Sequence, residues 1–292
     1  MHALAPAHYR RHVRIATALL VVIVFSGAAV RLTGSGLGCD AWPNCSEGQI
    51  VPEFTYHGTI EYGNRAFSGL VSLAVAFAVL GAYRRTPRAK RLIVGSWGLV
   101  AGIVFQIVWG NYVVSHELHP FFVAVHFLAS MVLLANALYL LDRATDDQPR
   151  RPVVRALVPH QLLQLGLGVA VILTGTFVTG AGPNSGDVNV VRTDFDLAAI
   201  ARIHSAFVWL FLASLLALLF RIGKTDAAQR LRTTHLPLLA VTVLQGAVGY
   251  VQYFTGVPAL IVFVHIVGAT ALWCALVWSV LQSWTPANDS AR

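Results

Sequence analysis

The chain has 292 residues, of which 56% are hydrophobic and only 12% are charged, and its mean hydropathy is +0.65. Because a soluble globular domain carries about 25% charged residues, this composition excludes a soluble globular enzyme, a disordered tail and a collagen-like fibre. The formal net charge is +8, but the 21 Lys and Arg residues are scattered between long apolar runs and do not form the basic face that nucleic acid requires. The composition predicts a polytopic membrane protein without a nucleic-acid partner.

Eight stretches are long and apolar enough to cross a lipid bilayer as helices of about 20 residues. They are residues 15–33, 66–83, 92–114, 121–141, 156–178, 197–220, 236–254 and 259–281. The alternating pattern of a membrane β-barrel is absent from the sequence, so the predicted fold class is all-α. The first stretch follows three arginines, as a secretory signal would, but it has a counterpart later in the chain and is interpreted as a retained helix.

The basic residues favour one side of the membrane. Most of them lie in the N-terminal tail, in the connections around residues 84–91, 143–155 and 221–232, and at the C-terminus. Loops rich in Lys and Arg face the cytoplasm, so both termini are predicted to be cytoplasmic in the cell membrane. Four arginines fall on the outer side instead, namely Arg31, Arg65, Arg192 and Arg202.

The two halves of the chain repeat. Residues of the first half recur with nearly constant offsets in the second, and the matched pairs are Gln106 and Gln245, Gly110 and Gly249, His126 and His265, Asn64 and His204, and Gly27 and Gly175. This repeat predicts two four-helix bundles related by a pseudo-twofold axis along the membrane normal. The predicted bundles are residues 1–141 and 156–292, joined by a cytoplasmic linker at residues 142–155.

Three of the eleven histidines lie inside predicted membrane helices, namely His126, His204 and His265. An ionisable side chain in a membrane helix is costly and usually faces a partner inside the bundle. His204 and His265 can face each other across a gap of porphyrin size, and imidazole pairs on facing helices commonly hold haem iron. Tetrahedral zinc normally takes further Cys, Asp or Glu ligands. Haem is therefore the predicted cofactor.

The remaining histidines are expected outside the apolar interior. His160 and His235 flank the inner starts of two helices, where a solvated or interfacial position is the simplest interpretation. His57, His116 and His119 are expected in outer loops.

The first half departs from the second at Asn64, where the repeat predicts a histidine. An amide is a poor iron ligand, so His126 would be the one strong axial ligand there, opposite a weak or open position. Glu61 lies three residues before Asn64, on the same helical face. It is a candidate for acid–base catalysis or charge stabilisation, although a carboxylate near a helix start also suits the helix dipole.

Three of the outer arginines are candidates for binding haem propionates, because a guanidinium pairs well with a carboxylate. They are Arg31, Arg65 and Arg202. Arginines near helix ends also extend toward the membrane interface without any ligand, and both interpretations stay open at this point.

Two of the three cysteines frame the sequence CDAWPNC in the first outer loop. Thiols outside the cytoplasmic membrane can oxidise, and the spacing of Cys39 and Cys45 around a turn allows a bridge. A disulfide is predicted, either structural or redox-active. Cys274, deep in the last helix, is expected to serve packing.

Over nearly its whole length the chain resembles the haem A synthase family. The resemblance lies in GAAVRLTGSGLGCDAWPNC, IEYGNR, QIVWGNYVV, VHFLAS, TGTFVTGAGPNSGD, QYFTGVP and VHIVGAT. It implies an oxidoreductase that converts a methyl group of haem o into the formyl group of haem A, which is then supplied to cytochrome oxidase. Haem o would be the substrate, a haem o synthase a possible partner, and the electron donor is unidentified.

The resemblance also assigns residues. His204 and His265 match the ligands of a bound haem b, His126 matches a ligand of the substrate haem, and Glu61 matches an acidic residue of the second helix. Cys39 and Cys45 match the cysteines of the first loop. The family often has histidine where this chain has Asn64 and Asn184, and some members have a second cysteine pair where residues 183–196 have none.

Two other functions fit parts of the sequence. A membrane b-type cytochrome that only transfers electrons would use the same haem ligands. A transporter would share the repeated bundles, but it predicts broken helices and a charged substrate partner at the membrane midplane, and the sequence shows neither.

Overall fold

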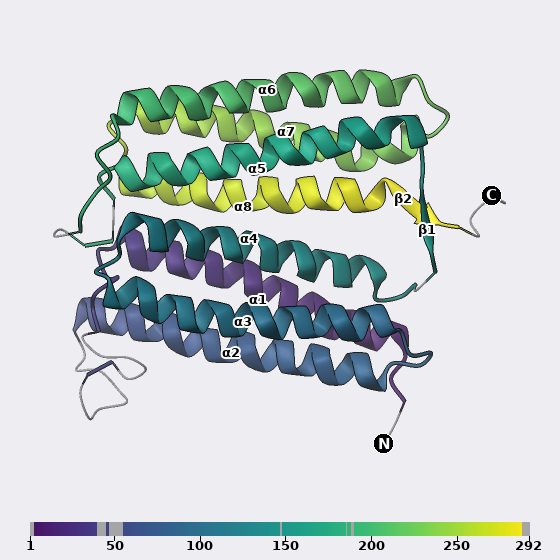
Figure 1. Cartoon of the computed structure of the whole chain (residues 1–292), viewed down its shortest axis with the longest axis horizontal. Coiled ribbons are helices and arrows are strands. Elements are labelled where there is room, and N and C mark those ends of the chain that lie inside the picture. The colour runs from purple at the N-terminus through teal and green to yellow at the C-terminus, as the bar shows by residue number, and fades with distance from the viewer. Residues whose placement is uncertain are drawn as a thin grey trace. The chain divides into compact units, whose positions relative to one another are not determined.

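The structure, a computed structural model, describes residues 3–39, 45–46, 55–146, 148–184, 186–187 and 190–287. The long helices, in chain order, are α1 (Pro6–Leu32), α2 (Tyr56–Arg84), α3 (Lys90–Ser115), α4 (Pro120–Arg143), α5 (Val158–Ala181), α6 (Leu197–Gly223), α7 (Ala228–Phe254) and α8 (Ala259–Gln282) (Figure 1). The short elements are the strands β1 (Arg150–Pro152) and β2 (Trp284–Pro286) and the 3-10 helix η1 (Arg155–Leu157). Within these residues, eight helices are long and apolar enough to cross a membrane. The predicted all-α, multi-pass membrane class is confirmed.

Several helices extend beyond the predicted apolar stretches. α1 begins at Pro6 rather than at residue 15, and α7 begins at Ala228 rather than at residue 236. Apolar composition marks only the part of a helix suited to lipid, whereas the hydrogen-bond ladder continues into polar sequence. Pro6 also occupies a position at the start of α1, where its fixed φ and missing N–H fit a helix.

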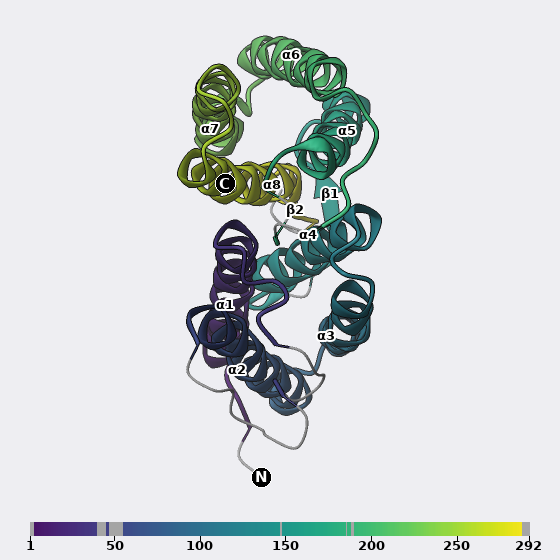
Figure 2. The same ribbon diagram turned by 90° about the vertical axis from the view of Figure 1, so that its left-hand side faces the viewer.

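The chain divides into two compact units. Unit 1 comprises Met1–Thr145 and Thr179–Asp194, and unit 2 comprises Asp146–Val178 and Phe195–Arg292. In unit 1, α1 and α3 each pack against both α2 and α4, which closes a ring of four helices (Figure 2). The predicted pseudo-twofold relation and the predicted boundaries at residues 141 and 156 stay predictions.

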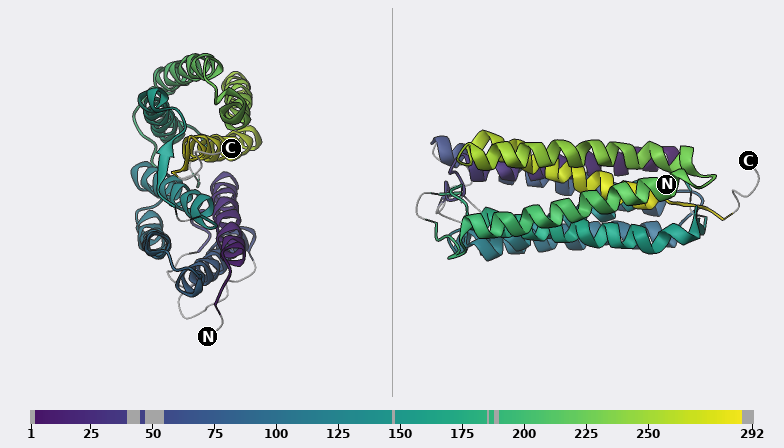
Figure 3. Two further views of the ribbon diagram at one scale, coloured as in Figure 1. Left: turned by 90° about the vertical axis from the view of Figure 1, so that its right-hand side faces the viewer. Right: turned by 90° about the horizontal axis from the view of Figure 1, so that it is seen from above.

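Unit 2 holds the other four helices. α7 packs between α6 and α8, and α5 completes the group (Figure 2). Gln164 on α5 donates to the carbonyl of Phe211 on α6 at 3.2 Å. β1 and β2 pair antiparallel next to the start of α5 and the end of α8. Within each unit the helices run alongside one another over most of their length (Figure 3).

One histidine differs from its expected environment. His235, expected to be solvated or interfacial, is only 1% exposed, and its Nδ1 lies 2.8 Å from the carbonyl oxygen of Leu231. The expectation was wrong because α7 begins two turns earlier than its apolar stretch, so His235 lies inside the helix rather than at its start.

A buried arginine ties the turn after α2 to the end of α4. Arg85 is 2% exposed, its Nε donates to the carbonyl of Ala144 at 3.1 Å, and its guanidinium also bonds the carbonyl of Pro87. The backbone of Leu4 bridges to Arg85 as well. The guanidinium thus satisfies carbonyl groups that would otherwise be buried without a donor.

Replacing this arginine tests its structural role. Arg85→Met should lower the free energy of unfolding by about 1–3 kcal/mol, because a buried carbonyl loses its donor. The exposed neighbour provides a matched control, since Arg84→Met changes the same residue type on the same turn. Thermal unfolding in detergent, followed by tryptophan fluorescence, measures both variants. Equal melting temperatures for the two variants would contradict the assignment.

Candidate functional site

Each intramembrane imidazole lies against a glycine of the preceding helix. The three pairs are His126 on α4 with Gly110 on α3, His204 on α6 with Gly175 on α5, and His265 on α8 with Gly249 on α7. A Cβ atom placed on these glycines would lie 3.6, 3.3 and 3.2 Å, respectively, from Cε1 of the facing imidazole. The two closest of these distances are tighter than ordinary van der Waals contact. The repeated glycines therefore make room for the rings.

A threonine fixes the orientation and tautomer of the His204 ring. The hydroxyl of Thr174 donates to the carbonyl of Ala170 at 2.8 Å, and its oxygen lies 3.1 Å from Nδ1 of His204. Because a hydroxyl has one hydrogen, the Thr174 oxygen must accept from Nδ1–H. The lone pair of this imidazole is then on Nε2, which is the arrangement that metal-ligating histidines require.

His204 and His265 are close enough to interact electrostatically. Both rings are half-buried, and Nδ1 of His265 has no hydrogen-bond partner among the residues described. The same part of the chain contains no group of three or more His, Cys, Asp or Glu side chains suited to a metal ion. A tetrahedral zinc site therefore does not fit unit 2. Haem fits, because the porphyrin supplies four ligands and the protein supplies only the axial ones.

In unit 1, the matched residues are Ser26 for Thr174, Gly27 for Gly175 and Asn64 for His204. Asn64 on α2 takes the place of His204, and the hydroxyl of Ser26 on α1 donates to Asn64 Oδ1 at 2.8 Å. Ser26 precedes Gly27 just as Thr174 precedes Gly175. A Cβ atom placed on Gly27 would meet none of the described atoms within 4 Å. The space that the His204 ring fills in unit 2 is therefore open beside Gly27.

Around His126, a glutamine joins α3 to α4. Nε2 of Gln106 donates to the carbonyl of His126 at 3.1 Å and to the hydroxyl of Ser130 at 2.8 Å. Nδ1 of His126 is buried and makes no hydrogen bond to the described part of the chain. Gly110 and the backbone contact of Gln106 therefore set the position of the ring.

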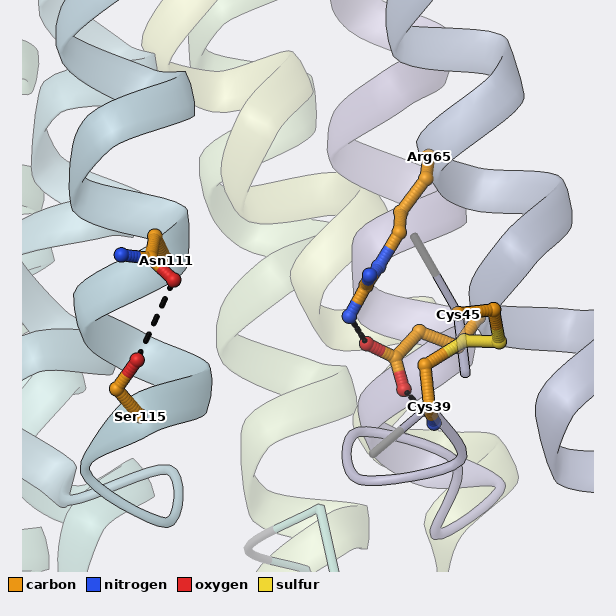
Figure 4. Close-up of polar contacts among 6 residues, drawn as sticks. Cys39, Cys45, Arg65, Asn111 and Ser115 are labelled. Carbon is orange, nitrogen blue, oxygen red and sulfur yellow. Dashed lines mark hydrogen bonds and ion pairs between the residues drawn. A yellow bond between two sulfur atoms is a disulfide. The ribbon is translucent and has the colours of Figure 1, made fainter. Parts of the chain in front are cut away.

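Glu61 connects the disulfide loop to α2. Its carboxylate is buried at 4% exposure, Oε2 accepts from the backbone N–H of Cys39 at 2.8 Å, and Oε1 forms a 2.6 Å ion pair with Arg65 (Figure 4). Cys39 and Cys45 form a disulfide with a Cα–Cα separation of 4.5 Å, which confirms the predicted bridge. The carboxylate thus connects the backbone of Cys39 with the guanidinium of Arg65.

The outer arginines have different environments. Arg31 on α1 is half-buried and donates to the carbonyl of Thr179 at 3.2 Å, while Arg65 pairs with Glu61. Arg202 is exposed. It stands two residues before His204, and side chains two apart on a helix point to roughly opposite sides. The structure therefore brings Arg31 and Arg65 to the same end of unit 1, where α1 ends and α2 begins, but does not bring Arg202 to the His204 imidazole.

The hydroxyl groups are the site residues that sequence reasoning missed. Thr174 and Ser26 precede matched glycines of the repeat, and that position was the signal available in the sequence. His57, expected in a loop, lies in the first turn of α2, where its Nδ1 is 2.9 Å from the hydroxyl of Ser35.

Enlarging a glycine beneath an imidazole tests whether the contact holds the ring. Gly249→Val should weaken haem binding in unit 2 by about tenfold or more, as losses around a metal ligand do, because the new side chain displaces the His265 ring. Gly246→Val on the same helix is the matched control, since a Cβ there meets none of the described atoms within 4 Å. The pyridine haemochrome assay gives the haem-to-protein ratio. Equal haem content in the two variants would contradict the role of Gly249.

Fold and site together define a multi-pass helical membrane protein with three imidazoles inside its spans. Residues 10–183 match the family model described as cytochrome oxidase assembly protein (COX15-CtaA), and the chain belongs to this family.

Several curated proteins are similar to it. The heme A synthase of Halalkalibacterium halodurans is 26% identical over 276 residues, covering 90% of this chain and 92% of that protein. The heme A synthase of Listeria welshimeri is 26% identical over 303 residues, covering 94% of each. A protoheme IX farnesyltransferase of Thermus thermophilus is 30% identical over 241 residues, which are 76% of this chain but 34% of that longer protein.

Proposed function

We propose that this protein is a haem A synthase, a membrane oxidoreductase that oxidises a methyl group of haem o to the formyl group of haem A. Family membership supports the proposal, as does similarity to proteins named heme A synthase over 90% or more of the chain. The structural observation that carries it is the difference between the two units. Unit 2 contains the two imidazoles of His204 and His265, whereas unit 1 contains His126 and has Asn64 at the position that the repeat matches to His204.

In this proposal, unit 2 binds haem b. His204 and His265 would hold the haem iron, and Thr174 bonds Nδ1 of His204, which leaves Nε2 available. A bound haem with two imidazole ligands supplies reversible one-electron transfer. Gly175 and Gly249 let the rings approach the helix backbones closely, so the protein fixes the ring planes before haem arrives. The exposure of Arg202 favours a place at the membrane interface over a contact with this haem.

Unit 1 is proposed to bind haem o through His126. Arg31, half-buried at the outer end of α1, is the candidate partner for a haem propionate, because its guanidinium donates to a neutral backbone carbonyl, that of Thr179, rather than to a carboxylate. Arg65 is the second candidate, and its charge is shared with Glu61. Guanidinium groups suit carboxylates because they donate two parallel hydrogen bonds.

Glu61 is proposed to stabilise charge or to carry a proton during the oxidation. The carboxylate is buried within unit 1 and stands one helical turn from Asn64, on the side of α2 that the disulfide loop covers. The N–H of Cys39 and the guanidinium of Arg65 hold it in place. A fixed, buried carboxylate in an apolar setting acts more strongly on nearby charge than a solvated one does.

The membrane orientation is also part of the proposal. The excess of Lys and Arg in alternate connections supports cytoplasmic termini in the cytoplasmic membrane. The disulfide and Glu61 then lie toward the outer face, where a disulfide is stable. An enzyme that supplies haem o and a separate electron donor are the partners that this reaction requires.

A charge-removing change tests Glu61. Glu61→Gln keeps the size of the side chain and should retain haem, but the yield of haem A should fall by about a hundredfold, as expected for the loss of an acid–base group. Glu117→Gln, an exposed glutamate between α3 and α4, is the matched control. The protein is co-expressed with a source of haem o, and the extracted porphyrins are separated by chromatography. An unchanged haem A yield would remove Glu61 from the mechanism.

The same chromatogram tests the function itself. The wild-type protein should convert haem o into haem A, whereas a b-type cytochrome that only transfers electrons would return haem b and unaltered haem o. The complete absence of haem A from the wild-type extract would therefore overturn the proposed function.

A further inference from the structure

We infer that Ser26, Gly27 and Asn64 form a binding site for a neutral diatomic ligand on the open side of the haem held by His126. The inference rests on the proposed binding of a haem in unit 1 and goes beyond it, because it assigns what occupies the side opposite His126. The ligand class is that of carbon monoxide and dioxygen, and carbon monoxide is the probe.

The first support is the open space beside Gly27. At the three other matched places of the repeat, an imidazole lies against the glycine. At Gly27, the facing residue is the shorter Asn64, and a Cβ atom there would have no described neighbour within 4 Å. Asn64 therefore supplies no imidazole at the place where His204 supplies one in unit 2.

The second support is the orientation of the Asn64 amide. The hydroxyl of Ser26 donates to Oδ1 at 2.8 Å, and Oδ1 is the only amide atom with a lone pair suited to a metal. Because this oxygen is held against α1, the NH₂ group points away from Ser26. Asn64 thus presents hydrogen-bond donors rather than a ligand atom.

Each unit has a hydroxyl group just before the matched glycine, on Ser26 in unit 1 and on Thr174 in unit 2. The first donates a hydrogen bond to its partner, and the second accepts one. In unit 2, Thr174 accepts from Nδ1 of His204 and leaves the metal-binding nitrogen free. In unit 1, Ser26 donates to Asn64 and uses one of the two lone pairs of the amide oxygen. The residue that this hydroxyl contacts, His204 in unit 2 and Asn64 in unit 1, therefore decides whether the haem carries a second protein ligand or keeps a coordination position open.

The position of the site within the membrane spans favours an uncharged ligand. Ser26 and Asn64 are half-buried in helices suited to span the membrane, and bringing an anion into such an environment is costly. A neutral diatomic molecule enters without that cost, and its terminal atom can accept a hydrogen bond from the Asn64 amide.

The test is carbon monoxide binding to the full-length, haem-loaded and reduced protein, followed by the Soret band and by the infrared C–O stretch. The wild type should bind carbon monoxide at one of its two haems, and His126→Ala should abolish this binding. Asn64→His should remove it as well, by supplying a second imidazole. Asn64→Leu should still bind, about tenfold more weakly and with a shifted C–O stretch, because one hydrogen bond is lost.

A hydroxyl outside the site provides the control. Ser26→Ala should change the C–O stretch, because the amide is no longer held, whereas Ser72→Ala, which removes a hydroxyl bonded to the backbone of its own helix, should leave it unchanged. The inference is overturned if the wild type binds no carbon monoxide, if binding does not depend on His126, or if Asn64→Leu equals the wild type in affinity and C–O stretch.

Porphyrin chromatography of the same preparations separates this inference from the proposed function. Haem A formed without carbon monoxide binding would overturn the diatomic site alone. Carbon monoxide binding without haem A would overturn the proposed synthase activity alone.

Discussion

An imidazole inside a membrane helix needs room beside a neighbouring backbone and a partner for its polar atoms. A glycine on the preceding helix provides the room for His126, His204 and His265. Without that glycine, the ring would be pushed away from the neighbouring helix. Polar groups in the spans are costly unless they are satisfied, and the hydroxyl of Thr174 satisfies Nδ1 of His204.

In the proposed function, the same set of matched positions serves electron transfer in unit 2 and oxidation of the substrate haem in unit 1. A hydroxyl, a glycine and a polar residue of the next helix recur in both units, and only the last residue differs between His204 and Asn64. In unit 2 the hydroxyl prepares an imidazole for a metal, whereas in unit 1 it holds an amide by its oxygen. A site with two fixed imidazoles suits electron transfer, and a site with one suits a haem that is itself chemically altered.

At the outer end of unit 1, the disulfide loop and the helix carrying Asn64 are joined through one carboxylate. Glu61 accepts from the backbone of Cys39 and pairs with Arg65, so a negative charge is held within the apolar interior with its compensating cation beside it. The same Cys39 is bridged to Cys45, so the residue that donates to Glu61 is also part of the disulfide.

The sequence predicted the spans, the disulfide and the histidines inside the helices, because long apolar runs and polar residues within them are strong local signals. It did not predict where α1 and α7 begin, or the burial of His235, since a helix continues beyond its apolar part. The exposure of Arg202 and the roles of Thr174 and Ser26 were also missed. The sequence of a helix that is apolar on all sides does not reveal which face packs against a neighbouring helix. A hydrogen bond between a hydroxyl group and another helix depends on which faces meet, so it could not be predicted.

The central claim, that the imidazoles of His204 and His265 hold one haem iron, is tested most directly by near-infrared magnetic circular dichroism of the oxidised, haem-loaded protein. The account predicts a signal of bis-imidazole ligation that is lost in His204→Ala and in His265→Ala but kept in His126→Ala. A bis-imidazole signal that survives either of the first two substitutions, or disappears with the third alone, would contradict it.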